Sequence, residues 1–157
     1  MKRLLLKLAI TATVCTLLSS NPTVAQILPP AKKAARVEIT QGPALEMARD
    51  DMAIIRWTTN NPGGTDVHFG VVHYGTDPTD LSQTARSPIS VNRGHPETIF
   101  RVRMPGLKPQ TTYYYKVTSE ESNGKNYGVE SPVKQFTTPA PGERIVAYPP
   151  QPDPQPK

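Results

Sequence analysis

A catalytic or metal site in this chain would have to be built from its histidines and carboxylates. The sequence has three histidines, and its single cysteine, Cys15, lies in an apolar stretch near the N-terminus. His68 and His73 are five positions apart in a segment that predicts a strand, so their side chains point to opposite faces and cannot share an ion within it. His95 precedes Pro96 and is interpreted as a solvated loop residue. We therefore expect no metal and no cofactor.

Motifs of covalent and acid-base catalysis give no better candidate. The sequence contains no Gly-x-Ser-x-Gly elbow for a nucleophilic serine. Asp50-Asp51 and Glu120-Glu121 are adjacent acidic pairs, but neighbouring side chains diverge on a strand or a turn, so both pairs are interpreted as solvated. The sequence therefore predicts no catalytic residue and a protein that is not an enzyme.

Arginines offer a first candidate binding surface. If the first, second and fifth main strands share a sheet, then Arg56, Arg101 and Arg103 project from its outer face together with Glu38. Guanidinium groups bind anionic partners through forked hydrogen bonds. The alternative is a ladder of charges across the strands that only keeps the sheet soluble.

The opposite sheet offers a second candidate surface, made of His73, Tyr114 and Lys116. An exposed tyrosine beside cations is typical of surfaces that bind sugars or proteins. The alternative is that Tyr114 only packs along its neighbours. The loops at 60–65 and 120–127 are further candidates, because binding residues concentrate on loops that a rigid scaffold holds.

Strands are the elements that must position these side chains. Apolar residues alternate with polar ones between turn residues, which predicts strands near 37–39, 53–57, 72–74, 100–104, 113–117 and 133–138. The segment from Leu81 to Pro96 predicts one short edge strand or none. We expect an all-β, two-sheet antiparallel sandwich of about seven strands with Greek-key connections. Its predicted core residues are Trp57, Tyr74, Leu107, Tyr113, Tyr115 and Phe136.

The segment from Leu107 to Tyr113 reads Leu-Lys-Pro-Gln-Thr-Thr-Tyr and has the form of a tyrosine corner, in which the phenol binds the backbone of a crossing loop. With Trp57 on the second strand, it makes the chain resemble the fibronectin type III superfamily, which has an immunoglobulin-like fold. The chain is most similar to the N-terminal domain of purple acid phosphatases. Four phrases carry that likeness: 39–43, 55–59, 72–76, and 113–117 ahead of 136–139.

This resemblance implies a sandwich without catalytic residues. In purple acid phosphatases the metal ions and the chemistry belong to a separate metallophosphatase domain that follows the sandwich. No position in this sequence, which ends at Lys157, matches a metal ligand of that domain. The resemblance therefore carries over the fold and not the acid phosphatase activity.

Sequence composition divides the chain into four parts. A positive start at Lys2, Arg3 and Lys7, an apolar run and a small-residue site at Ala25 predict a secretory signal peptide over residues 1–25. Residues 26–36 are expected to be a flexible lead, 37–138 the folded domain, and 139–157 a proline-rich, disordered tail. The net charge of the whole sequence is +5, and the leader contributes +3 of it, so cleavage would leave +2.

These features predict an exported, non-catalytic module, secreted or periplasmic, that binds a protein or a glycan or serves as a spacer. We expect a monomer with no nucleic-acid partner and no membrane span in the mature chain. The alternative is an accessory or truncated piece of a purple acid phosphatase.

Overall fold

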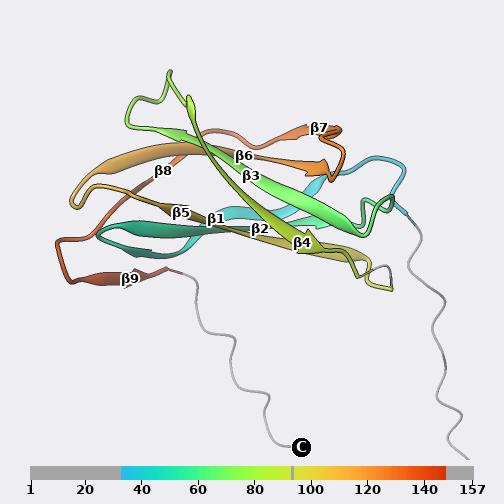
Figure 1. Ribbon diagram of the computed structural model, residues 1–157, viewed down its shortest axis with the longest axis horizontal. Helices are drawn as coiled ribbons and strands as arrows, with labels where there is room; N and C mark the ends of the chain where they lie inside the picture. The colour runs from blue at the N-terminus through green and yellow to red at the C-terminus, as the bar shows by residue number, and fades with distance from the viewer. Residues whose placement is uncertain (1–32, 93, 148–157) are drawn as a thin grey trace, which may run out of the picture.

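The computed structural model describes residues 33–92 and 94–147, and these residues form nine strands and no helix (Figure 1). They therefore include no long apolar helix that could cross a membrane. The predicted signal peptide, the first residues of the lead and residues 148–157 lie outside the described residues. The strands are β1 (Ile39–Arg49), β2 (Met52–Asn60), β3 (Val67–Gly75), β4 (Gln83–Ser90), β5 (Glu97–Pro105), β6 (Thr112–Glu121), β7 (Asn126–Glu130), β8 (Lys134–Thr137) and β9 (Arg144–Val146).

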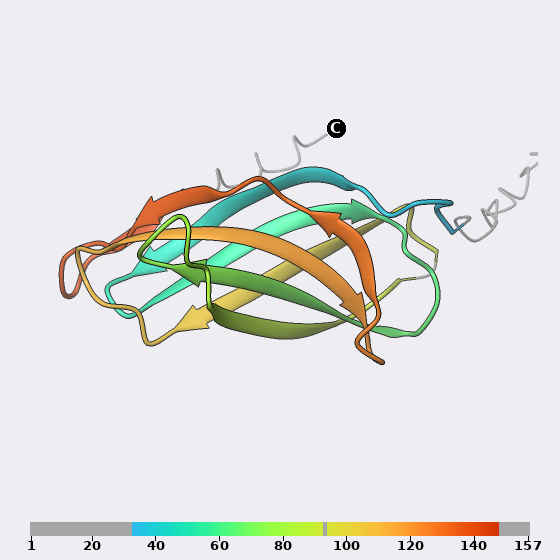
Figure 2. The ribbon, with the colours of Figure 1, turned by 90° about the horizontal axis from the view of Figure 1, so that it is seen from above.

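Two sheets face each other. One has four strands in the order β5-β2-β1-β9, and the other has five, in which β4-β3-β6-β7 are neighbours and β8 also pairs with β6. All these strand pairs are antiparallel. The two layers lie along the same long axis (Figure 2). The predicted all-β, two-sheet sandwich is confirmed.

The core between the sheets is built around Trp57, which is 1% exposed. Its ring stacks on Phe100 of β5 with 5.2 Å between centroids, and its Nε1 donates a hydrogen bond of 3.2 Å to Ser119 Oγ of β6. Alternate residues of each strand point inward. The inward-pointing residues of β3 and β6, such as Val72 and Val117, complete the core. The buried cluster includes all six predicted core residues: Trp57, Tyr74, Leu107, Tyr113, Tyr115 and Phe136.

Tyr113 fixes the crossing between β5 and β6. Its phenol oxygen accepts a hydrogen bond of 2.9 Å from the backbone amide of Lys108, and its ring stacks on Phe136 with 5.9 Å between centroids. Leu107 is buried beneath the same crossing. This is the geometry of a tyrosine corner, in which one side chain supplies both packing and a tether for the loop.

The first residues after 138 differ from the predicted disordered tail. Arg144–Val146 form β9, which pairs with β1 from Arg49 to Met47, and Ala147 N donates a hydrogen bond of 3.1 Å to Glu46 O. All three β9 residues are exposed. The strand is therefore held by backbone hydrogen bonds, and the predicted boundary at 139 is corrected to include residues up to 147.

We expect alkaline pH to destabilise the fold through Tyr115. Burial raises the pKa of its phenol to about 12, whereas an exposed tyrosine titrates near ~10. The neutral phenol therefore contributes its full stability below pH ~10, and this contribution is lost as the pH rises toward 12. Tyr115→Phe should lose less stability over that interval in urea unfolding. Burial also raises the pKa of Tyr74, so some loss remains in the variant; an equal loss in both chains would contradict the prediction.

Candidate binding surface

His73 and Lys116 meet on the outer face of the five-stranded sheet. They are directly opposite each other in the register of β3 and β6, and Tyr114 is opposite Gly75 two residues further along. All three side chains are half-buried. The strands therefore bring the three residues of the second predicted surface to one face.

A groove of about 550 Å³ lies on this face. Most of its polar residues come from β3, β6 and β7, Thr79 comes from the β3–β4 connection, and its apolar walls come from that connection and the residue before β8. Tyr114 does not line it. The lining residues are His73, Pro78, Thr79, Leu81, Lys116, Thr118, Asn126, Glu130 and Val133.

The groove holds hydrogen-bonding groups of several kinds. His73 Nε2 lies 3.3 Å from Thr118 Oγ1, and Lys116 Nζ donates a hydrogen bond of 2.6 Å to Glu130 Oε1. At the rim, the Thr79 hydroxyl and backbone amide bind the Asp77 carboxylate and lower its pKa. An ammonium, an imidazole and carboxylates beside apolar walls can orient a polar ligand.

Several of the residues that line the groove could not be predicted from the sequence. Leu81, Glu130 and Val133 are distant in the sequence and come together only through the loop and the strand register. Arg86 is a further example: its guanidinium lies 3.4 Å from the centroid of the Phe69 ring and forms a 2.7 Å ion pair with Glu120. No local pattern reports such contacts, because each depends on the pairing of β3 with β4 and β6.

The predicted arginine surface lies on the other sheet. Arg56 is directly opposite Arg101 in the register of β2 and β5, and Arg103 is opposite Ile54. Arg101 forms an ion pair with Glu46 of β1, and its hydrogen bond to that carboxylate raises the pKa of Arg101.

Glu38, which the sequence placed beside these arginines, lies just before β1, and its backbone is hydrogen-bonded to Asn60 at the end of β2. The ion pair uses Glu46 because a register shift between Leu45 and Met47 places it there. The two predicted surfaces thus belong to separate sheets and do not form one site.

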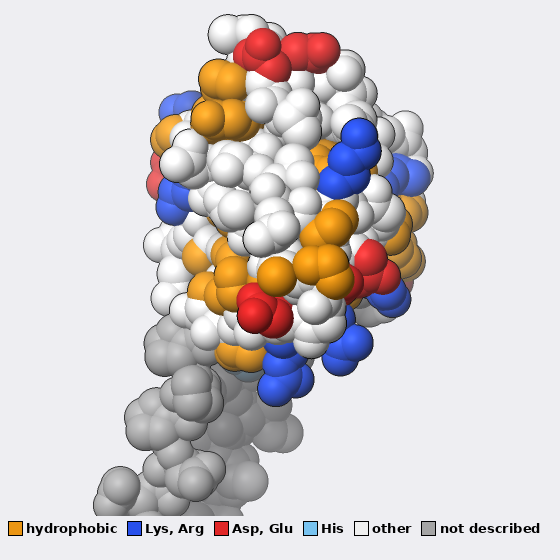
Figure 3. Space-filling model, turned by 90° about the vertical axis from the view of Figure 1, so that its left-hand side faces the viewer, with side chains coloured by type: hydrophobic (Ala, Val, Ile, Leu, Met, Phe, Trp, Pro, Cys, Tyr) orange, Lys and Arg blue, Asp and Glu red, His pale blue; other side chains and the backbone are white. Residues whose placement is uncertain are grey.

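The end of the sandwich at the left of Figure 1 carries loops from both sheets. In Figure 3 its Lys and Arg side chains are interspersed with Asp and Glu, and its hydrophobic side chains form small islands. The visible described residues of this end therefore offer no continuous surface of one charge.

Carboxylates and histidines do not gather into a cluster in residues 33–92 and 94–147. No group of three or more His, Cys, Asp or Glu side chains there could hold a metal ion. His68 is fully buried, with Nε2 2.6 Å from Thr65 O, whereas His73 lines the groove of the outer face.

The family model of the purple acid phosphatase N-terminal domain matches residues 40–138. The chain belongs to this family. The match confirms the predicted resemblance. It covers the sandwich of this chain from β1 to the end of β8. No catalytic domain is matched.

Solved structures similar to this purple acid phosphatase N-terminal-like domain come from several kinds of protein. The solution structure of the sensor domain of the anti-sigma factor RsgI4 in Pseudobacteroides cellulosolvens is 25% identical with a TM-score of 0.49, over 77% of this chain and 92% of that one. The third fibronectin III domain of a human protein is 16% identical with a TM-score of 0.35, over 73% and 86% of the two chains. No curated protein matches the chain.

Proposed function

We propose that the chain is an exported, non-catalytic sandwich module that binds a protein or glycan partner in the groove on the outer face of β3, β6 and β7. The groove carries the proposal, because His73, Lys116 and Glu130 line it beside the apolar side chains of Leu81 and Val133. Export is supported by Lys2, Arg3 and Lys7 ahead of the apolar run that leads to Ala25.

Groove variants test this proposal on the purified chain. Lys116→Ala removes the ammonium that binds Glu130 and should weaken binding about tenfold, the loss that corresponds to ~1.4 kcal/mol. His73→Ala should weaken binding as well. The matched control is Arg103→Ala, an exposed cation on the other sheet, which should leave binding unchanged.

The measurement begins with a glycan array and with crosslinking to proteins of the exported fraction, followed by titration of any ligand found. Equal affinity of the Lys116→Ala and Arg103→Ala variants for that ligand would exclude the groove as the binding site. Failure of the wild-type chain to bind any glycan or exported protein more strongly than the double variant of His73 and Lys116 would count against a binding function.

The family match favours a second candidate, in which the chain is an accessory or truncated piece of a purple acid phosphatase. The reading frame next to this one in the gene distinguishes the two. A neighbouring frame that carries metallophosphatase motifs would favour the second candidate, and its absence would favour the free binding module.

A further inference from the structure

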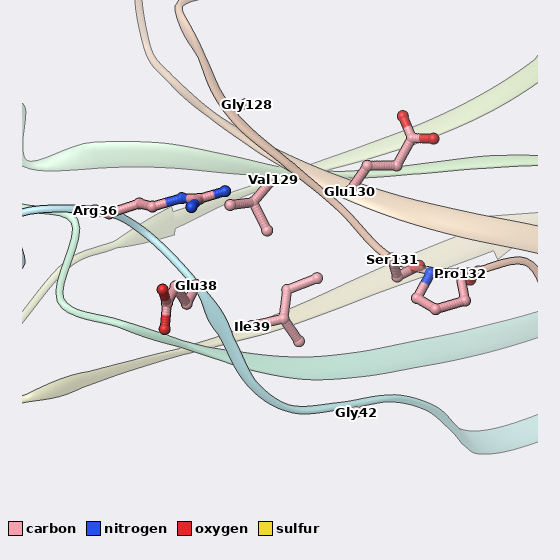
Figure 4. Close-up of a pocket in the computed structure, with 9 residues that line it drawn as sticks. All are labelled: Arg36, Glu38, Ile39, Gly42, Gly128, Val129, Glu130, Ser131 and Pro132. Atoms are coloured by element: carbon pink, nitrogen blue, oxygen red, sulfur yellow. Dashed lines mark hydrogen bonds between the residues drawn. The ribbon is translucent and has the colours of Figure 1, made fainter.

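A second hollow lies at the open side of the sandwich, between the start of β1 and the end of β7 (Figure 4). We call it the edge slot. Its volume is about 420 Å³, and its lining residues are Arg36, Glu38, Ile39, Gly42, Gly128, Val129, Glu130, Ser131 and Pro132. Among the described strands, β9 pairs with β1 only from Met47 to Arg49. The edge of β1 beside the slot is therefore not covered by β9.

The walls of the edge slot combine apolar side chains with the guanidinium of Arg36 and the carboxylate of Glu38. Ile39 and Val129 point toward each other across it, and Arg36 extends toward Val129 (Figure 4). Gly42 and Gly128 contribute no side chain to the walls. The carboxylate of Glu130 turns away and binds Lys116 on the outer face of the sheet. An occupant should therefore be extended and rich in apolar rings, with a negative charge near Arg36 and none near Glu38.

The direction in which β9 runs along β1 leads toward this slot. Because β9 is antiparallel to β1, the chain runs from Arg49 toward Met47 and reaches Glu46 through the hydrogen bond from Ala147. In an antiparallel ladder the next amide facing β1 would belong to residue 149. That residue is a proline without an N–H, so the ladder cannot continue as a strand.

Residues 148–157 have the length and composition that the slot requires. The segment reads Tyr-Pro-Pro-Gln-Pro-Asp-Pro-Gln-Pro-Lys, and its prolines favour a polyproline II conformation with ~3.1 Å per residue. Ten residues would span ~31 Å, whereas the path along β1 from Glu46 to Ile39 spans ~23 Å at the rise of a strand. Asp153, the only acidic residue of the segment, would then come beside the part of the slot into which Arg36 extends.

We propose that residues 148–157 of this chain occupy the edge slot as a polyproline II strap. The proline rings pack on Ile39, Val129 and Pro132, and Asp153 forms an ion pair with Arg36. This inference is independent of the groove on the outer face, and it gives the proline-rich segment a role within the domain in place of a spacer. An extended proline-rich partner would have to displace the strap to enter the slot.

The test compares methyl NMR spectra of the purified full chain with those of a chain that ends at Ala147. Removing the segment should shift the signals of Ile39 and Val129, while those of Val102 and Val117 in the core remain in place and report an intact fold. Arg36→Glu in the full chain should shift the same two signals toward their positions in the shortened chain. The matched control is Arg103→Glu, which should not shift them.

A charge exchange tests the ion pair itself. Asp153→Arg should release the strap as Arg36→Glu does, and the double variant should return the Ile39 and Val129 signals to their positions in the full chain. Identical signals in the full and shortened chains would overturn the proposal. Shifts that grow with protein concentration, together with a dimer in analytical ultracentrifugation, would also overturn it, because the occupant would then be the segment of a second copy.

Discussion

Trp57→Ala should lower the free energy of unfolding by ~3–5 kcal/mol, the range for removing a large aromatic side chain from a core. Trp57 is 1% exposed and stacks on Phe100, so the substitution leaves a cavity between the two sheets. It also leaves the Ser119 hydroxyl without the Nε1–H that it accepts. A domain of this size is stable by only ~5–15 kcal/mol, so the variant should be close to unfolding at growth temperature.

Two further variants separate the causes of this loss. Trp57→Phe keeps a ring against Phe100 but removes the donor to Ser119, and it should cost less than Trp57→Ala. Arg103→Ala changes an exposed side chain and should stay within ~0.5 kcal/mol of the wild type. Urea unfolding with an unchanged m-value measures all three. A loss below ~1 kcal/mol for Trp57→Ala would mean that the core does not depend on this ring.

The central strands could be predicted from the sequence because their inward positions are strongly apolar. Ile55 and Trp57 on β2 and Phe100 and Val102 on β5 are all buried, and their spacing of two residues reports the pleat directly. The tyrosine corner was equally legible, because the Leu107–Tyr113 phrase encodes a hydrogen bond within a few residues. Interactions between residues that are close in the sequence can thus be recognised from a single sequence.

The edge strands could not be predicted in this way. β4 has one buried residue, Ala85, among eight, because it covers little of the core and pairs only with β3. β9 has none. Both strands are positioned by backbone hydrogen bonds, which every residue except proline can make, so the side chains carry no periodic signal.

The candidate groove was predictable only in its centre. His73 and Lys116 follow from strand alternation, since each lies on an expected strand and points away from the core. Leu81 and Val133 complete the groove through the paths of the connections that follow β3 and precede β8. Glu46 illustrates the same limit, because its ion pair with Arg101 depends on an irregular register in β1.

Gly70→Ala should destabilise the protein by ~1–3 kcal/mol, the usual cost of overpacking a core. A β-carbon at this position would lie 2.8 Å from Cη2 of Trp57 and 2.9 Å from Cγ2 of Val102. Neither neighbour can move away easily, because both side chains are buried and interiors are close-packed. Gly70 has no positive φ, so the expected loss is steric and not a matter of backbone strain.

A double-mutant cycle with Trp57→Phe isolates this contact. Phenylalanine lacks the outer indole atoms that meet the new β-carbon, so Gly70→Ala should cost less in the Trp57→Phe background than in the wild type. The contact with Val102 remains and should leave a residual cost. Additive losses in urea unfolding would mean that Gly70 is not constrained by the indole ring. A smaller loss for the double variant than the sum of the two single losses would show that the packing of the two sheets requires glycine at 70 because it requires tryptophan at 57.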